Sequence, residues 1–470
     1  MEDSMPIKSL KFGDSLAGLL VDGIDETPFV VATLTYTENQ GVRIEVPYAH
    51  HANSEQFAIA ERWFDTETPP RNLIFMTQDG QLSLFNCRYS GHSMNIGQGF
   101  ATGYISPGEV ILNARDGDLN DELLVSRLSS EIDGLSEWTH FRAIRHERET
   151  DEDSRIRRIT VTAESVERLS WNQGAATMTL ETSWSTSDSA LGFQIIEWVA
   201  LESRFATPTP VSHHLAEQKK LITLLTLMFG KPIYFRRHKI KDARFTDKTL
   251  AGKIVGEAFY ELVSHRTTRD AAHPKPTARD LGRPIVHMAQ IGEDGLRRWN
   301  NSYEEWKRFI QPSVSVLSRP GAFIENIVVN NSMSLEAAGN LLGHADGEES
   351  THTTRRRPTT ATFNFRALAA LGLDWEGVSA SITGLAKAIA NNYNTIKHYD
   401  RGEFPDPAQT LIVSKIVLVI AQLLAVKLVD PSGQLIEDYE KSFSFKELRK
   451  ICKRQDLYIE DSGEFTNYPS

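Results

Sequence analysis

Short runs in which apolar and polar residues alternate fill the N-terminal part of the chain and predict β-strands there. Residues 29–36, 41–47 and 72–76 are rich in Val, Ile, Thr and aromatic residues, which strands favour. The Asp-Gly pair at residues 79–80 lies between two such runs and predicts a hairpin, because these residues tolerate positive φ. Further runs of this kind lie at residues 81–85, 157–162, 176–182 and 193–200. Many short strands joined by turn residues favour an antiparallel sandwich or a curled sheet.

A helix is expected directly after Pro210, where the apolar spacing changes from two residues to three or four. Ser212 is the expected N-cap, and Gly230 is the expected end of the helix. Residues 234–241 then form a strand-like run of high positive charge. An exposed edge strand protected by charge is the simpler interpretation of this run, and a phosphate-facing strip is the alternative. Residues 131–138 are expected to form a short helical insertion.

Helical patterns dominate the C-terminal part of the chain. We expect residues 264–283 to form a linker or long loop, and residues 347–360 to form a second loop between helices. The sequence therefore predicts an α+β protein, in which an antiparallel β-rich, sandwich-like domain (8–290) precedes an all-α helical bundle (291–460). The expected helices of the bundle are residues 296–310, 322–342, 375–400, 408–429 and 445–454.

The most apolar stretch of the chain is residues 411–429. It contains Lys415, Gln422 and Lys427, and a charge near the centre of a membrane costs roughly 2.5–3.5 kcal/mol. We therefore interpret it as a buried or interface helix, with no membrane contact. Residues 1–10 lack the features of a signal peptide, and the two cysteines lie far apart in the chain, so a reducing, cytoplasmic location is expected.

Charge and composition restrict the ligands that the chain is expected to bind. The formal net charge is −11, from 51 Lys and Arg against 62 Asp and Glu, which argues against a protein that coats nucleic acid. Any contact with RNA is then confined to a small basic patch. No cluster of Cys and His has the spacing of a metal site, so we expect no metal and no cofactor.

The helix that ends near residue 400 separates an apolar face from a polar one. At about 100° per residue, Ile382, Leu385, Ala386, Ile389, Tyr393 and Ile396 share one arc, which predicts the face toward the core. The opposite face carries a set of residues that we call the polar stripe, because side chains three, four and seven apart stack along a helix. The polar stripe consists of Lys387, Asn391, Asn394, His398 and Arg401.

The end of this helix has the side chains that metal-free RNA cleavage requires. Attack by the RNA's own 2′-hydroxyl needs a base, an acid for the leaving 5′-oxygen, and positive charge on the phosphorane. His398 near the helix end, with Lys397 and Arg401 beside it, supplies part of this set, and a two-fold related copy would supply the rest. The alternative is that His398 and Arg401 cap helix carbonyls and face water.

These residues resemble a known family. The segment from Asn391 to His398, followed by Tyr-Asp-Arg-Gly, resembles the signature helix of HEPN domains, whose motif is Arg, a polar residue, three variable residues and His. Residues 134–138 (Gly-Leu-Ser-Glu-Trp) and the helix from Pro210 to Gly230 resemble the β-rich domain that precedes HEPN in ApeA-like antiphage proteins. The resemblance extends over nearly the whole chain in order and length.

The resemblance implies a HEPN ribonuclease of bacterial defence, dimeric through its helical domain. A phage-derived trigger protein would activate it, and cleavage of RNA, with tRNA as the leading substrate, would halt translation in abortive infection. His398 matches the His of the motif and Asn394 its polar position, whereas Tyr393 stands where the Arg is expected. Lys397 or Arg401 would then supply the charge, and Glu336 would be the acidic residue that HEPN domains often place on an earlier helix.

Three functions follow from these patterns. In the first, the chain is a metal-independent endoribonuclease with His398 as general acid or base, Asn394 as its positioning partner, and Lys397 and Arg401 stabilising charge. Two copies would then meet across a groove formed partly by helix 411–429, with the β-rich domain as sensor or regulator. In the second, Tyr393 marks a HEPN-like domain that lost catalysis and acts as a dimerising or RNA-binding scaffold. In the third, the β-rich domain binds a ligand through a stacking surface of Trp138, Trp171, Trp184 and Trp198.

Overall fold

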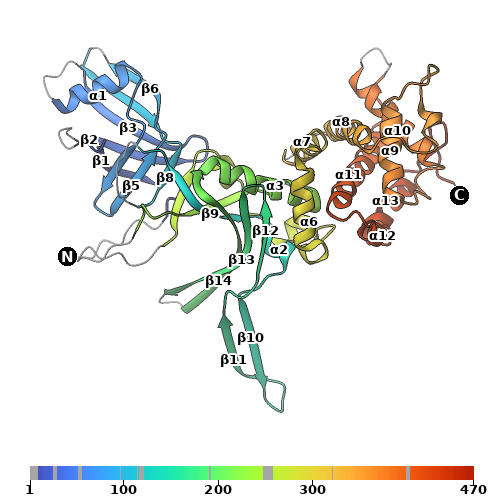
Figure 1. Cartoon of the computed structure of the whole chain (residues 1–470), viewed down its shortest axis with the longest axis horizontal. Helices are drawn as coiled ribbons and strands as arrows, with labels where there is room; N and C mark the ends of the chain where they lie inside the picture. The colour runs from blue at the N-terminus through green and yellow to red at the C-terminus, as the bar shows by residue number, and fades with distance from the viewer. Residues whose placement is uncertain are drawn as a thin grey trace.

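The structure of the chain is a computed structural model. The described residues are 9–24, 29–50, 55–95, 97–113, 115, 121–189, 192–246, 258–319, 321–398 and 403–469. A large antiparallel sheet of 14 strands forms the first part, and a helical region forms the last part (Figure 1). This arrangement confirms the predicted α+β class.

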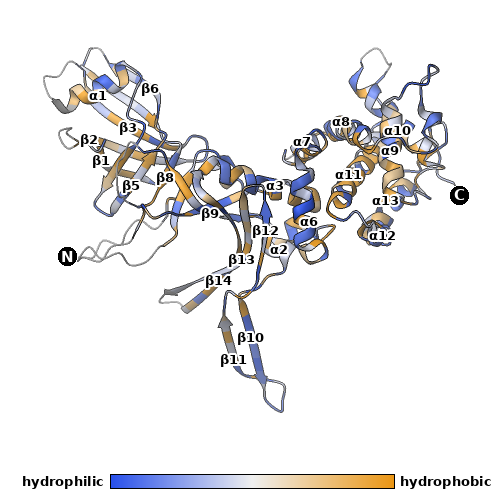
Figure 2. Ribbon diagram, in the orientation of Figure 1, coloured by the Kyte–Doolittle hydropathy of each residue, from blue (hydrophilic) through white to orange (hydrophobic). Residues whose placement is uncertain are grey.

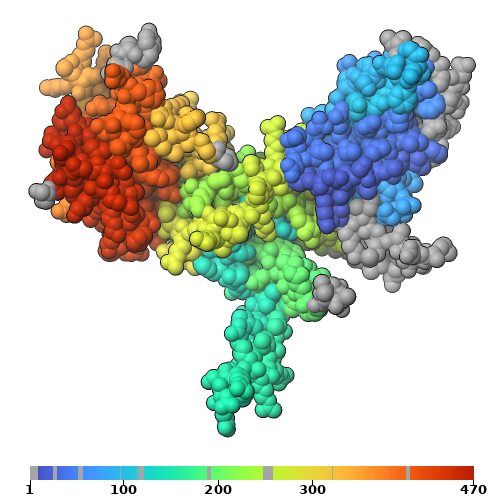
Figure 3. Space-filling view, turned by 180° about the vertical axis from the view of Figure 1, so that it is seen from behind, coloured from blue at the N-terminus to red at the C-terminus, as the bar shows by residue number. Residues whose placement is uncertain are grey.

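The main sheet runs in the order β12-β13-β14-β9-β15-β16-β8-β5-β4-β1-β2-β3-β7-β6. A separate two-stranded hairpin, β10 (Ile144–Thr150) and β11 (Ile156–Ala163), projects from the body of the molecule as an arm (Figures 1 and 3). The strands of the main sheet are β1 (Ser15–Val21), β2 (Val30–Thr37), β3 (Gly41–Ala49), β4 (Leu73–Thr77), β5 (Gly80–Phe85), β6 (Arg88–Asn95), β7 (Phe100–Ser106), β8 (Glu109–Ile111), β9 (Leu124–Ile132), β12 (Arg168–Gln173), β13 (Ala176–Ser189), β14 (Gly192–Pro210), β15 (Phe235–Lys241) and β16 (Tyr260–Ser264).

Helices α1 to α4 contact the sheet, and α6 to α13 form the helical region. The helices are α1 (Glu55–Asp65), α2 (Leu135–Thr139), α3 (Val211–Phe229), α4 (Thr268–Ala272), α5 (Ala278–Leu281), α6 (Met288–Tyr303), α7 (Lys307–Leu317), α8 (Ile324–Leu342), α9 (Thr360–Leu371), α10 (Ile382–Lys397), α11 (Pro407–Val429), α12 (Gln434–Glu440) and α13 (Phe443–Arg454). A 3₁₀ turn, η1 (Glu348–Thr351), precedes α9, and the short hairpin of β17 (Tyr458–Ile459) and β18 (Phe465–Thr466) follows α13.

The predicted strands are present with shifted ends, and so are the predicted helices, except that residues 296–310 span the end of α6 and the start of α7 instead of one helix, and the helix predicted from residue 375 begins at Ile382. The hairpin at residues 73–85 forms, but Thr77 pairs with Gly80, so Gln78 and Asp79 are the two loop residues instead of Asp-Gly. The short helix α2 starts at Leu135, since Glu131 and the residue after it still belong to β9. Residues 264–283 contain two short helices, α4 and α5, and α9 is an additional helix after the 347–360 loop.

Helix α3 ends where the sequence predicts and begins one step earlier. Gly230 has φ of 63°, and its N–H donates to the Thr226 carbonyl, as expected for a glycine at a helix end. Ser212 is not the N-cap. Pro210 occupies that position, with no side chain capping the first turn.

The positively charged strand β15 lies inside the sheet, between β9 and β16, so the prediction of an exposed edge strand is wrong. Carboxylates of neighbouring segments neutralise its arginines. Arg236 pairs with the buried carboxylate of Asp133, and Arg237 pairs with Glu131 and Glu261. The two arginines of the strip therefore offer little free charge to a phosphate, because each is paired with carboxylates of neighbouring segments.

Two hydrophobic clusters form the interior. The smaller one lies among β1–β8 and α1, between Leu10 and Leu112. The larger one extends from Phe85 to Ile459, and it joins the second half of the sheet, α3, and the helices α6–α13. It therefore crosses residue 290 without a break.

Helix α11 lies at the centre of the helical region, in contact with α3, α6, α8, α9, α10 and α13, and it is strongly hydrophobic (Figure 2). It is the one described helix long and apolar enough to cross a membrane by composition, and 72% of its most apolar window is buried inside the chain. Such burial is that of a core helix. Because 14 of its 23 residues are buried, α11 has little surface left for the dimer groove that the sequence suggested there.

Candidate functional site

Helix α10 carries the residues that the sequence singled out. Ser381 caps its start, since the side-chain oxygen accepts a hydrogen bond of 3.1 Å from the Gly384 N–H. The predicted core face is correct, because Leu385, Ala386, Ile389 and Tyr393 are buried, and Ile382 and Ile396 pack against the core.

The helix ends at Lys397, earlier than the predicted end at residue 400. His398 has an extended backbone (φ −114°, ψ 106°), and its N–H donates to the Asn394 carbonyl at 3.0 Å. The side chain of His398 is exposed and forms no hydrogen bond with the described residues. Arg401 lies outside the described residues. His398 therefore stands exposed at the end of the helix.

Tyr393 and Lys397 form a pair on the side of α10 next to the polar stripe. Tyr393 is only 2% exposed, and its hydroxyl accepts a hydrogen bond of 3.1 Å from Lys397 Nζ. This hydrogen bond, followed by the charges of Tyr393 and Glu336, raises the pKa of Lys397. The ammonium therefore stays protonated at neutral pH, where it can stabilise negative charge but cannot act as a base.

A groove of about 850 Å³ runs beside this pair, lined by residues of α7, α8, α9 and α10, and we call it the α7–α10 groove. Tyr393 and Lys397 line one side, and Glu336 of α8 lines another. Glu336 Oε1 accepts a hydrogen bond of 2.5 Å from Thr360 Oγ1. Three of the predicted site residues, separated by up to 61 positions in the chain, are thus brought to one groove.

The remaining predicted residues lie on the adjacent polar stripe. Asn391 is exposed and Asn394 is half-buried, and neither amide forms a hydrogen bond with the described residues. Lys387, at the other end of the stripe, is covered by the hairpin β17–β18, since a Cβ at Gly463 would lie 2.5 Å from its Cβ. The accessible part of the stripe is therefore its C-terminal end, from Asn391 to His398.

Two basic residues of the α7–α10 groove were not predicted. Lys307 and Arg308 open α7 and line the groove, together with Gln311 from the next turn. Lys307 pairs with Glu304 at 3.2 Å, whereas Arg308 is exposed and forms no ion pair with any described residue. Sequence spacing gives no direct sign of this contribution, because it depends on how α7 packs against α8.

One group of described side chains has the geometry of a metal site, and it lies far from α10. His50, Glu61 and Asp65 place one ligand atom each within 4.8 Å of one another, next to α1 at the opposite end of the molecule (Figure 1). His50 Nδ1 already pairs with Glu61 at 2.7 Å. This ion pair accounts for the proximity of the two side chains, and the group supplies nothing to the groove.

The four tryptophans of the β-rich part do not form a common stacking surface. Trp138 and Trp171 are buried in the core. The indole N–H of Trp138 donates to the Val286 carbonyl at 3.0 Å, and that of Trp171 donates to Gln173 Oε1 at 3.1 Å. Trp184 is 41% exposed on β13. The stacking surface of the third hypothesis is therefore wrong in this form.

The residues that suggested an ApeA-like domain hold α3 against the sheet. His214 and Gln218, both fully buried on α3, bond to β9 and β14 through Ser203 and backbone carbonyls. Ser130 links Gln218, at 2.5 Å, to His238 of β15, at 2.7 Å. Burial lowers the pKa of His214 and lowers the pKa of His238 to about 3, so both rings are neutral parts of this network.

The Gly-Leu-Ser-Glu-Trp segment has a packing role as well. Gly134 adopts φ of 74° at the start of α2, and a Cβ there would lie 2.9 Å from the ring of Phe229, at the end of α3. Trp138 is fully buried and donates to the loop before α6. Both motifs therefore fix α3 between the sheet and the helices.

A comparison with protein families gives a match for the β-rich part of the chain. The family described as ApeA N-terminal domain 1 matches residues 22–301, more than half of the chain, and the match ends within α6. The match is consistent with a protein family of antiphage defence and does not include α7–α13. Searches of the curated proteins and of the solved structures gave no match. On the strength of the matched β-rich domain, the chain belongs to the ApeA N-terminal domain 1 family.

Proposed function

We propose that this protein is a metal-independent endoribonuclease of the HEPN type that acts in antiphage defence. The observation that carries the proposal is the end of α10. The exposed His398 directly follows Lys397 in the chain, and Lys397, bonded to Tyr393, lines a groove with further basic residues. The ApeA-type domain supports the link to defence.

In this proposal His398 transfers the proton. Histidine is the side-chain type whose charge changes closest to neutral pH, and it can therefore act as base toward the 2′-hydroxyl or as acid toward the 5′-oxygen. Asn394, one turn earlier on the same stripe, would orient the ring or hold a phosphate oxygen. Lys397 would stabilise the negative charge of the phosphorane, because its raised pKa keeps it cationic.

The guanidinium missing at position 393 would be replaced from another helix. Arg308 enters the α7–α10 groove from α7, and no described carboxylate neutralises it. A guanidinium binds a phosphate with two parallel hydrogen bonds, as the arginine of the HEPN motif would. Arg401 is a second source of charge in the proposal, and Glu336 would position the ammonium of Lys397.

One histidine in each chain supplies one proton transfer at a time, whereas cleavage needs both a base and an acid. We therefore propose a homodimer in which the C-terminal ends of the two α10 helices face each other and act on one phosphodiester together. The substrate would be a cellular RNA, with tRNA as the first choice. The β-rich domain would act as the sensor of a phage-derived trigger protein.

A second function is favoured by the burial of Tyr393. An arginine at a position that is 2% exposed would need a buried counter-charge, so the helix is built around the phenol and not around the motif. A HEPN-like scaffold that binds RNA or dimerises without cutting would have this property.

The two functions differ in their dependence on His398. We would express wild type, His398→Ala and, as a matched control, the exposed His344→Ala in bacteria infected with a panel of phages, and follow tRNA integrity on gels. The ribonuclease proposal predicts tRNA fragments and growth arrest in wild type and His344→Ala, and neither in His398→Ala. Equal fragments in all three would refute the role of His398. Protection from phage without fragments in any of the three would favour the scaffold.

A further inference from the structure

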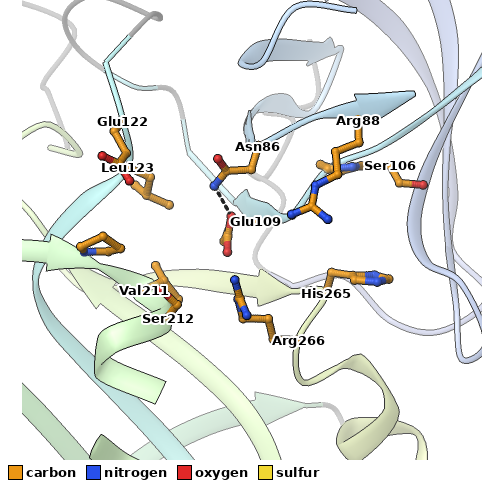
Figure 4. Close-up of a pocket in the computed structure, with 13 residues that line it drawn as sticks. Asn86, Arg88, Ser106, Glu109, Glu122, Leu123, Val211, Ser212, His265 and Arg266 are labelled. Atoms are coloured by element: carbon orange, nitrogen blue, oxygen red, sulfur yellow. Dashed lines mark hydrogen bonds between the residues drawn. The ribbon is translucent and has the colours of Figure 1, made fainter. Parts of the chain in front are cut away.

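A second cavity lies where the two hydrophobic clusters meet, far from α10, and we call it the junction cavity. It measures about 420 Å³ and is lined by five segments, namely the β5–β6 turn, the β7–β8 turn, the residues before β9, the start of α3 and the residues that follow β16 (Figure 4). A volume of this size falls in the range of small-molecule sites. None of the functions argued above uses this cavity.

Two arginines and a histidine line one part of the junction cavity. Arg88 comes from the start of β6, and His265 and Arg266 follow β16. All three side chains are exposed to solvent, and none forms an ion pair with a described carboxylate. The backbone at His265 is tied to the β7–β8 turn, because the His265 N–H donates to the Gly108 carbonyl at 2.9 Å. The guanidinium charges of Arg88 and Arg266 are left for a ligand.

A carboxylate faces the same space. Glu109 is only 6% exposed, and it lies near the middle of the residues drawn in Figure 4, with Arg266 on one side and Asn86 on the other. Asn86 Nδ2 donates a hydrogen bond of 2.7 Å to Glu109 Oε2. No other side chain of the described residues bonds to this carboxylate, and no cation lies within ion-pair distance. The second oxygen of Glu109 is therefore left free to accept from a ligand in the cavity, with Arg266 nearby (Figure 4).

The wall opposite Arg88 and His265 is partly apolar. Leu123 and Val211, both mostly buried, lie there on the side away from Arg88 and His265, with the exposed Glu122 beside Leu123 (Figure 4). This wall includes the first turn of α3, whose backbone N–H groups have no side-chain cap. One cavity thus presents an apolar wall, two carboxylates and two arginines.

We propose that the junction cavity binds a nucleotide. Its phosphates would lie against Arg88, His265 and Arg266, because arginine binds phosphate oxygens with paired hydrogen bonds. The nucleoside would lie against Leu123 and Val211. An N–H group of the base would donate to Glu109, which can only accept in its ionised form. A free inorganic anion would leave both the apolar wall and the carboxylate unused.

The proposal is independent of the ribonuclease function, since no lining residue belongs to α7–α10. It does place the ligand at the start of α3, a helix that contacts α7 and α11 at its other end. The nucleotide would therefore sit in the ApeA-type domain, on the element that connects this domain to the helical region.

The test is isothermal titration of the full-length protein with ATP, GTP, CTP and UTP, and separately with inorganic phosphate. The variants are Arg266→Ala and Glu109→Gln, with Arg269→Ala as a control, because Arg269 is exposed, three residues further along the chain, and not part of the cavity. Arg266 and Arg269 are both surface residues, so neither change should affect folding.

The expected result is saturable binding of at least one nucleotide, weakened by roughly tenfold or more in Arg266→Ala. Binding is unchanged in Arg269→Ala, and Glu109→Gln changes which of the four bases binds best, because the amide offers a donor as well as an acceptor. Three results would overturn the proposal: no binding of any nucleotide, equal affinity for inorganic phosphate, or binding to Arg266→Ala as tight as to wild type.

Discussion

Tyr393 is the residue at which the sequence departs from the HEPN pattern, and the structure gives a physical reason for the phenol. The ring of Tyr393 is buried in the core. Its hydroxyl reaches the α7–α10 groove and accepts a hydrogen bond from Lys397 Nζ. An aromatic side chain with one polar tip suits such a position. One residue therefore serves both packing and electrostatics.

These two contributions of Tyr393 can be separated by substitution. Tyr393→Phe keeps the ring and removes one hydrogen bond, so the expected loss in the free energy of unfolding is about 1 kcal/mol. Tyr393→Ala removes the ring and leaves a cavity, with an expected loss of about 3–5 kcal/mol. Urea unfolding of both variants measures the two values. Equal losses would contradict the packing role.

His238 makes the stability of the β-rich part depend on pH. Its folded pKa of about 3 lies below the ordinary value of 6.5, so between these values the unfolded chain binds a proton that the folded chain does not. The contribution of the neutral His238 ring to the free energy of unfolding is complete above pH 6.5. It is lost as the pH falls toward 3, by up to about 1.4 kcal/mol for each pH unit.

His238→Gln should therefore reduce the slope of stability against pH in this window, measured by urea unfolding from pH 4 to pH 7. The exposed His146→Gln on β10 is the matched control. If both variants show the slope of wild type, His238 is not the buried neutral group that this prediction requires.

Among the elements, β15 shows what a local pattern cannot predict. Its run of Arg, His and Lys has the composition of an exposed edge, yet the strand lies inside the sheet because its partners come from distant segments. Asp133, which pairs with Arg236, is 103 positions away in the chain. Helix α9 was missed for a related reason, since Thr362 and Asn364 face the core and weaken its apolar pattern.

Arg236 and Arg237 of β15 should differ strongly on substitution. Arg236→Ala would leave the carboxylate of Asp133, 1% exposed, without its partner, and the expected cost is about 3–5 kcal/mol. Arg237 is about half exposed, and Arg237→Ala should cost no more than about 1 kcal/mol. Thermal unfolding of the two variants side by side measures the difference, and equal midpoints would show that β15 is not held by Asp133.

At the scale of the whole molecule, the sheet and the helical region share one hydrophobic interior, whereas β1–β8 enclose their own. The sequence predicted the order of β-rich and helical parts, because strand and helix periodicities are local. It did not predict their shared core. That core depends on α3, which is bonded to the sheet by Gln218 and accepts, at the Leu227 carbonyl, a hydrogen bond of 2.8 Å from Gln422 of α11.

The shared core predicts how a local change spreads. Leu424→Ala on α11 should cost about 2–5 kcal/mol and lower hydrogen-exchange protection in β9 and β14 as well as in α9 and α10. Protection in β2 and β3 should not change. Leu34→Ala, in the smaller cluster, should have the reverse effect. Loss of protection confined to the helices in Leu424→Ala would mean that the two parts are energetically separate.

Part of the candidate site could be predicted from the sequence, because helix periodicity is a local property. Periodicity on a single helix placed His398, Asn394 and Lys397 at one end of α10, and the family resemblance added Glu336. Arg308 and the α7–α10 groove depend on the packing of helices that lie 20 to 90 positions apart, and no spacing rule predicts them.

The central claim is that His398 cleaves RNA without a metal ion, and one measurement tests it most directly. Purified protein is incubated with total bacterial RNA in EDTA, with and without lysate of phage-infected cells, for wild type, His398→Ala, Arg308→Ala and the control Arg319→Ala. The account predicts fragments ending in 2′,3′-cyclic phosphate for wild type and Arg319→Ala, a rate lower by roughly 100-fold or more in His398→Ala, and an intermediate loss in Arg308→Ala. Cleavage by His398→Ala at the wild-type rate, or cleavage that EDTA abolishes, would contradict it.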